Sequence, residues 1–222
     1  MSEFGKPLWV TCLLLMTVTG CAQMKSTTVS LQGLNCQSCG SSVVQKLTQE
    51  EGIEKAVFAR KDAEVQVEHA DGVWNGDALA SAIQGYGYGA ASGAGQGSYI
   101  PFPDYPPESD VEWLSRSGEA FDETRVSVPG KLTVVDFYAP WCGPCREVDR
   151  FLIYHMSNGA DFAVRKVNVS DWDSEVADQM GERLTSLPLV LVYDASGALV
   201  KSVPGLDLPT LKTVLGLDKE TP

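Results

Sequence analysis

Apolar and polar residues follow one another in a pattern that separates a short leader from two folded units. A mainly apolar run over residues 8–18 comes first, and it is too short to remain in a bilayer as a spanning helix. Units with the mixed signals of strands and helices follow at residues 26–90 and 110–222. The linker between them, residues 91–109, is rich first in glycine and then in proline. We expect a plain spacer, flexible and then extended, although its aromatic residues could dock on a domain surface.

In the first unit the pattern predicts the order strand, helix, strand, strand, helix. The expected elements are strands at 28–31, 53–59 and 63–68, an amphipathic helix with Val43, Val44 and Leu47 on one face, and a helix at 77–83. A final strand is poorly supported, because residues 88–97 consist mainly of Gly, Ala and Ser.

In the second unit the strongest signal is an apolar strand at 132–138 that leads into a helix over 142–156. Val111, Trp113 and Leu114 predict another helix near the start of this unit. The other expected elements are a strand at 162–169, a short helix at 175–180, a hairpin of strands 189–193 and 198–203, and a last helix at 208–217.

The composition allows two modest cores and argues against one class of partner. The 222 residues are 44% hydrophobic, and the formal net charge is −12 with a pI near 4.5. Because binding to nucleic acid needs a basic face, we expect no nucleic-acid partner.

The leader ends in Val18-Thr19-Gly20-Cys21, which resembles the lipobox of bacterial lipoproteins. The resemblance implies a lipoprotein signal peptide over residues 1–21 and lipidation of Cys21. It also implies an extracytoplasmic protein, lipid-anchored to a bacterial membrane on its periplasmic face, and Ala22 favours the outer membrane. A non-lipidated signal cut nearby and an uncleaved anchor are the alternatives.

Two of the six cysteines lie in the leader, and the rest form two Cys-x-x-Cys pairs. Cys142 and Cys145 stand where a strand turns into a helix. The N–H groups of a helix N-terminus lower the pKa of a thiol, so Cys142 is the expected nucleophile. Cys145, one turn further on, can resolve a mixed disulfide. Half of a zinc site is the alternative, but no second Cys-x-x-Cys or His pair follows; His69 and His155 are isolated and are expected to be surface or packing residues.

The run Trp141-Cys142-Gly143-Pro144-Cys145 resembles the active site of the thioredoxin family. The resemblance implies a thioredoxin fold over residues 110–222, with a central mixed sheet flanked by helices. Asp136 falls where the family keeps a buried carboxylate that moves a proton to and from the inner cysteine, and we expect this role; a satisfied buried acid is the alternative. Lys166 falls where a lysine pairs with that carboxylate, and we expect a solvated lysine at a strand end that also touches the acid.

The same resemblance implies a substrate surface. Pro188 falls where the family has a cis-proline that faces the disulfide, although it could simply end a loop. Trp141 and the backbone of 187–188 would flank the docked chain. Family members often carry Thr after this proline, whereas this chain has Leu189. This difference leaves the nature of the substrate surface undetermined.

The first unit carries Cys36 and Cys39 where its first strand meets its first helix. With Gly52-Ile53 and Gly85-Tyr86, this order resembles the heavy-metal-associated domain. The resemblance implies a ferredoxin-like βαββαβ fold in which the two thiolates hold a soft metal ion such as Cu(I). A redox or structural disulfide at the same pair is the alternative, since an oxidised pair cannot bind metal.

Together these features predict an extracytoplasmic, membrane-anchored thiol–disulfide oxidoreductase coupled to a metal-binding module, and we expect a monomer. The redox-active disulfide needs no separate cofactor. Gly-Pro between the cysteines resembles reducing members of the family, so an external membrane thiol donor would supply electrons. The substrate is the pair Cys36–Cys39 itself or a cysteine pair of a partner metalloprotein. A metal carrier or sensor with an accessory thioredoxin unit, and a disulfide-forming oxidase, are the alternatives.

Overall fold

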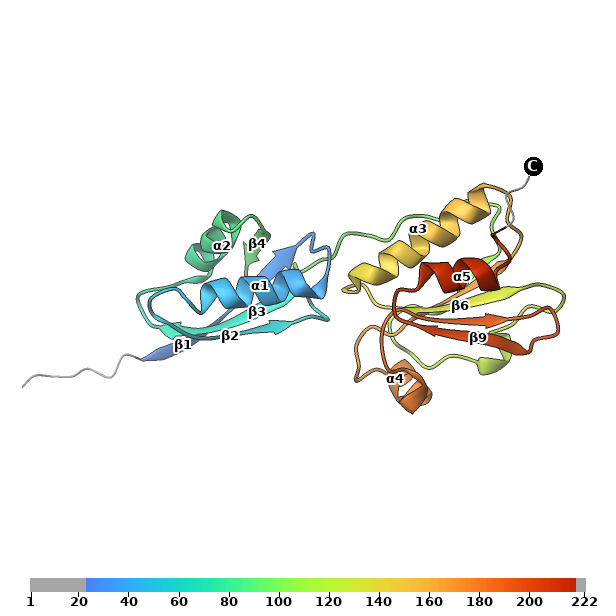
Figure 1. The fold of residues 1–222 in the computed structure, drawn as a ribbon. Coiled ribbons are helices and arrows are strands. Elements are labelled where there is room, and N and C mark those ends of the chain that lie inside the picture. The colour runs from blue at the N-terminus through green and yellow to red at the C-terminus, as the bar shows by residue number, and fades with distance from the viewer. Residues whose placement is uncertain (1–22, 219–222) are drawn as a thin grey trace, which may run out of the picture.

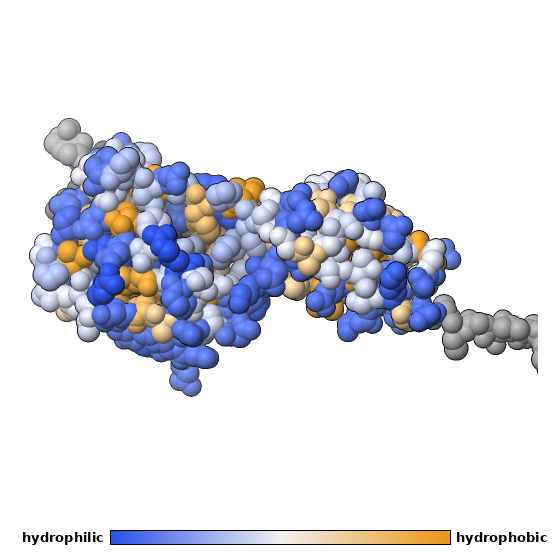
Figure 2. Space-filling view, turned by 180° about the vertical axis from the view of Figure 1, so that it is seen from behind, coloured by the Kyte–Doolittle hydropathy of each residue, from blue (hydrophilic) through white to orange (hydrophobic). Residues whose placement is uncertain are grey.

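Two β-sheets, each with helices packed against it, form two lobes joined by the linker (Figure 1). The structure is a computed structural model that describes residues 23–218. The expected signal peptide and Cys21 lie outside the described residues. Between residues 23 and 218, no helix is long and apolar enough to cross a membrane. Figure 2 shows a largely hydrophilic surface from behind and the narrower waist where the lobes meet.

The N-terminal lobe has the element order βαββαβ and a fully antiparallel sheet of strand order β2-β3-β1-β4. Its elements are β1 (Met24–Gln32), α1 (Gln37–Leu47), β2 (Ile53–Ala59), β3 (Glu64–Ala70), α2 (Gly76–Gly85) and β4 (Gly89–Ser92). The expected ferredoxin-like order is therefore present. The weak last strand is formed too, because Ala90 pairs with Leu31 at the sheet edge and its small side chain is buried there.

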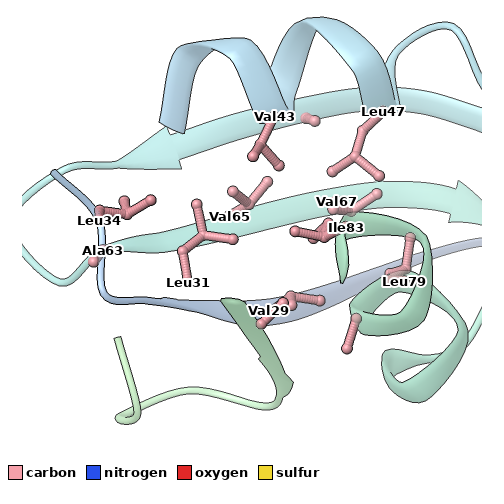
Figure 3. Packing of buried hydrophobic residues seen from close by; sticks show 13 residues of the cluster. Val29, Leu31, Leu34, Val43, Leu47, Ala63, Val65, Val67, Leu79 and Ile83 are labelled. Carbon is pink, nitrogen blue, oxygen red and sulfur yellow. The ribbon is translucent and has the colours of Figure 1, made fainter. Parts of the chain in front are cut away.

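Strand alternation and helix periodicity build the core of this lobe. Successive strand side chains point to opposite faces, so Val65 and Val67 are buried while Gln66 between them is exposed. Figure 3 shows the buried side chains of α1 and α2 directed at those of β1 and β3; the residues are Val43, Leu47, Leu79 and Ile83 from the helices and Val29, Leu31, Val65 and Val67 from the strands.

The C-terminal lobe is a mixed sheet of strand order β5-β7-β6-β8-β9. Its strands are β5 (Val111–Ser115), β6 (Thr133–Tyr138), β7 (Ala163–Asn168), β8 (Leu189–Tyr193) and β9 (Leu199–Pro204). Its helices are α3 (Gly143–Ser157), α4 (Glu175–Met180) and α5 (Leu208–Val214), with short 3-10 turns at Glu123–Arg125 and Gly181–Arg183. The strands β5, β7 and β6 run parallel, while β8 and β9 are antiparallel to their neighbours. The expected mixed sheet flanked by helices is confirmed.

Strand β6 is the centre of this lobe and is buried along its whole length. Val134 packs into the core formed with α3 and α5, and Val135 packs into the core formed with α4 on the other face. Because helices cover both faces, the strand reads as a continuous apolar run rather than an alternating one. Because both faces of β6 are packed, the strand holds the turn that follows its carboxyl end in one position.

The helix predicted at Val111–Leu114 is wrong, because this segment forms β5. Val111 pairs with Val164 of β7 in a parallel ladder that occupies the edge of the sheet. The local pattern of apolar residues fits a helix turn or a short strand equally well, and pairing with β7 decides between them.

The expectation of a plain spacer is also wrong, because the linker packs on both lobes. Ile100 N donates to Leu34 O at 2.9 Å, and the Tyr99 hydroxyl donates to Arg60 O at 2.6 Å. Further on, the Phe102 ring packs edge-on against Tyr138 with 5.0 Å between ring centroids. The aromatic residues of the linker therefore hold it against the surfaces of both lobes.

Replacing Phe102 by Ala should expose the linker to a protease of broad specificity. The ring holds the linker against the C-terminal lobe, and its loss should let residues 91–109 open locally and be cut several times faster. The matched control is Ile100→Ala, since Ile100 is 47% exposed. Equal cleavage rates for Phe102→Ala and the wild type would show that the packing does not restrain the linker.

Candidate active site

The redox turn lies between β6 and α3, and Cys142 is the N-cap residue of α3. In the structure Cys142 and Cys145 form a disulfide, and the Cys145 N–H points at the Cys142 sulfur at 3.1 Å. Pro144 lies in the first helical turn, where its missing N–H costs nothing. When the disulfide is reduced, the same N–H and the helix dipole favour a thiolate at Cys142. The geometry is that of a nucleophile with its resolving thiol one turn behind it.

Trp141 precedes Cys142 in this turn, and Leu187, the residue before Pro188, packs against the buried cluster that contains both. The indole N–H of Trp141 donates to Ser170 O at 2.6 Å, and the ring is buried. The peptide bond between Leu187 and Pro188 is cis.

Behind the disulfide lies a buried cluster of one cation and two carboxylates. Lys166 Nζ donates to Asp136 Oδ2 at 2.5 Å and to Asp149 Oδ1 at 2.7 Å. The expectation that Lys166 is solvated is wrong: it is 2% exposed. The reason is the register of the parallel ladder, which sets Lys166 of β7 directly beside Asp136 of the fully covered strand β6.

Asp149 was not among the residues singled out from the sequence. It follows Cys145 by four positions on α3, so both residues lie on one face of the helix. An acidic residue between the buried positions Val148 and Leu152 is the signal that could have indicated it. The linker contributes as well, because the Tyr105 hydroxyl donates to Asp149 Oδ1.

Burial raises the pKa of Asp136 to about 6; the positive charge of Lys166 opposes this rise, and the negative charge of Asp149 adds to it. Within residues 23–218, Asp136 Oδ1 and Asp149 Oδ2 are the buried side-chain oxygens without a hydrogen-bond partner. Lys166 thus forms ion pairs with two carboxylates. A carboxyl with a pKa of about 6 can accept or release a proton near neutral pH.

The second cysteine pair begins α1, with Cys36 at the N-cap. The two thiols are half-buried and free, and their sulfurs are 3.5 Å apart. Burial by itself would raise the pKa of both thiols. At Cys36 the hydrogen bonds with Ser38 and Cys39 outweigh burial and lower the pKa, whereas at Cys39 the hydrogen bond with Cys36 adds to the rise. Cys36 is therefore the more acidic thiol of the pair.

This donor set fits a soft ion and a disulfide alike. Two sulfurs at 3.5 Å are close enough to form a disulfide after a small movement, and two thiolates suit Cu(I) or a similar ion. No group of three or more His, Cys, Asp or Glu side chains arranged to hold a metal occurs in the described part of the chain. His69 is buried and contacts Thr27 Oγ1 at 2.9 Å, which is a packing role.

The two Cys-x-x-Cys motifs lie against each other. A cavity of about 400 Å³ is lined by both: Asn35, Cys36, Gln37, Ser38, Trp141, Cys142, Gly143, Pro144, Glu147, Leu187 and Leu206. Gln37 N donates to Trp141 O at 2.9 Å. A Cβ atom on Gly143 would lie 3.0 Å from the Cys36 Cβ, so the glycine permits this close approach. The outer cysteines, Cys36 and Cys142, line the shared cavity.

Contacts beside the cavity join the lobes. Arg60 of the N-terminal lobe forms an ion pair with Asp171 at 2.6 Å, and its guanidinium lies 5.1 Å from the centre of the Trp141 ring. The sequence offered no sign of this pairing, because the two partners are far apart in the chain and neither belongs to a motif.

Comparisons with known proteins agree with this geometry for the C-terminal lobe. Residues 113–214 match the family model described as Thioredoxin. The mitochondrial Thioredoxin-2 of Schizosaccharomyces pombe is 34% identical over 97 residues, which cover 44% of this chain and 69% of that protein. Thioredoxin-2 of Saccharomyces cerevisiae is 31% identical over 100 residues, covering 45% of this chain and 91% of that protein.

Among solved structures, the Hg(II) complex of the N-terminal domain of Tn501 mercuric reductase is 29% identical. The match covers 29% of this chain and 93% of that domain, with a TM-score of 0.28. At this score the similarity does not indicate what the N-terminal lobe binds.

Replacing Asp136 by Asn should change how stability depends on pH. The folded-state pKa of about 6 lies above the ordinary value of 3.8, so the carboxyl contributes fully below pH 3.8 and loses this contribution as pH rises through 6. Relative to Asp136→Asn, the wild type should lose about 3 kcal/mol of unfolding free energy between pH 3.5 and pH 8.

Urea unfolding of both proteins across this pH range measures the difference. Asp104→Asn is the control, since Asp104 is exposed in the linker. A wild-type and Asp136→Asn pair whose stabilities stay parallel at all pH values would contradict the raised pKa.

Proposed function

The chain belongs to the thioredoxin family and is a thiol–disulfide oxidoreductase, and we propose that it acts as a reductase on the cysteine pair of its own N-terminal lobe. The observation that carries this proposal is the shared cavity in which the loop of Cys36 lies against the turn of Cys142. Reduction keeps Cys36 and Cys39 ready for a metal ion.

The reaction proceeds through the two outer cysteines. With Cys142–Cys145 reduced and Cys36–Cys39 oxidised, the Cys142 thiolate attacks the Cys36 sulfur. A Cys36–Cys142 bond forms, the Cys36–Cys39 bond breaks, and Cys39 leaves as a thiolate that takes up a proton, which its raised pKa favours.

The inner cysteine of the C-terminal lobe completes the transfer. Asp136, whose pKa lies near neutrality, accepts the proton of Cys145. The Cys145 thiolate attacks the Cys142 sulfur, the Cys142–Cys145 bond forms, and Cys36 leaves as a thiolate. Two electrons have then moved from one pair to the other, and a thiol donor on a partner protein must reduce Cys142–Cys145 again.

The compartment belongs to the proposal as well. Cleavage after residues 1–20 and lipidation of Cys21 would anchor the chain outside the cytoplasm of a bacterium, with Ala22 favouring the outer membrane. There a thiol pair left alone becomes oxidised, which is why a metal-binding pair needs a reductase beside it. The donor would be a membrane protein with exposed thiols. Mass spectrometry of the mature N-terminal peptide tests the anchor, and a peptide without lipid on Cys21 would exclude it.

In a chain that starts at residue 23 and carries Cys145→Ser, a Cys36–Cys142 disulfide should accumulate once Cys36–Cys39 has been oxidised. The contact is built into the fold, so the rate should not depend on protein concentration. Peptide mapping without reductant identifies the linked cysteines.

The matched control adds Cys142→Ser to the same chain and should show no link between the lobes. A link that forms faster at higher protein concentration, or one that joins Cys39, would contradict transfer within the chain. Cys142–Cys145 acting as an oxidant of Cys36–Cys39 in the wild type would favour the oxidase alternative.

Cu(I) is the probe for the metal-binding proposal. The reduced chain should bind one Cu(I) through Cys36 and Cys39, and Cys36→Ser should weaken binding by about ten-fold or more, because it removes the more acidic thiol. Competition with a chromogenic Cu(I) chelator measures the affinity. Binding that survives in Cys36→Ser but not in Cys142→Ser would place the ion at the other pair instead.

A further inference from the structure

Arg146 is the residue directly after the inner cysteine, and it is buried although it carries a charge. It is 2% exposed, and no carboxylate within residues 23–218 forms an ion pair with it. A buried cation without a partner of opposite charge is costly unless its N–H groups are satisfied by hydrogen bonds. Its surroundings therefore show what holds it there.

The guanidinium donates to the backbone of three separate segments. Arg146 Nε donates to Asn35 O at 3.3 Å, Nη1 to Pro101 O at 3.0 Å and Nη2 to Pro140 O at 2.9 Å. These carbonyls belong to the N-terminal cysteine loop, to the linker and to the active-site turn. The Phe102 ring lies 4.4 Å from the guanidinium carbon and covers it from one side.

The first of these bonds fixes the residue immediately before Cys36. The planar guanidinium spreads its N–H groups over three nitrogens in a rigid fork, and each nitrogen reaches a different carbonyl. A lysine has a single nitrogen and cannot reproduce this spread. Burial lowers the pKa of Arg146, and so does Arg150, while negative charge on Asp149 and at Cys36 opposes this effect.

We propose that Arg146 is a positioning residue that holds the Cys36 loop over Cys142 and so makes the chain's own cysteine pair its preferred substrate. The inference rests on the proposed function and names the residue that sets its specificity. The same loop also forms one wall of the cavity beside Leu187, where it limits the space for a foreign chain. Weakening this hold should therefore shift the preference from the internal pair toward external disulfides.

Two rates test this proposal, and each is measured with and without the same substitution at Arg146. The internal rate is the formation of the Cys36–Cys142 link in the Cys145→Ser chain, and the external rate is the reduction of insulin by the chain with Cys145 intact and dithiothreitol as donor. Arg146→Gln should slow the internal rate by about ten-fold or more, since charge-assisted hydrogen bonds are lost. Arg146→Lys keeps the charge but not the fork, and should recover part of the rate.

The ratio of the two rates separates positioning from stability. In Arg146→Gln the internal rate should fall much further than the external rate, whereas a merely destabilised fold lowers both together. Arg150→Gln is the control on the same helix, because Arg150 is exposed and pairs with Glu147, and it should leave the internal rate as it was.

An internal rate in Arg146→Gln equal to that of its parent chain, or a parallel loss of both rates, would overturn the role of Arg146. A parent chain that forms no Cys36–Cys142 link at all would overturn the proposed function itself, and it is recognised without any Arg146 variant.

Discussion

The sharing of one buried lysine by two carboxylates connects the centre of the C-terminal sheet to the helix that carries the redox cysteines. Lys166 comes from β7, Asp136 from β6 and Asp149 from α3, so the ion cluster joins two strands to the helix that carries both cysteines. Two negative charges facing one positive charge in a dry interior favour keeping a proton in the cluster. The hydroxyl of Tyr105 in the linker donates a hydrogen bond to Asp149, so the linker is in direct contact with this ion cluster.

The contact between the lobes turns two separate motifs into one site. Gly143 lies between the two cysteines of the active-site turn, and because it has no side chain, the Cys36 loop can approach closely. A hydrogen bond from Gln37 N to Trp141 O also joins the loop to the turn. In the proposed transfer, a thiolate and its target held beside one cavity would react as an intramolecular pair, which removes the need for diffusional encounter. The fold thus supplies proximity, and because Cys36 lines the shared cavity, it is the sulfur that the proposed transfer would attack.

Most of the architecture could be predicted because its signals are local. Strand β6 is a run of apolar residues followed by a turn and a helix, and such a signal needs no knowledge of the rest of the chain. The segment Val111–Leu114 failed, since a few apolar residues become a strand only when a neighbour such as β7 offers an edge. The burial of Lys166 was missed for a related reason, because sequence does not reveal that both faces of β7 are covered.

By itself the sequence determined the chemistry: two cysteine pairs at helix starts, an acid within an apolar strand, and a proline before the last hairpin. Only the tertiary structure decided which of these groups meet. It brought Asp149 to Lys166, packed the linker aromatics on both lobes, and set Arg146 against the carbonyl of Asn35. The physical reason is that hydrogen bonds and ion pairs between distant segments depend on register and close packing, and neither leaves a periodic trace in the chain.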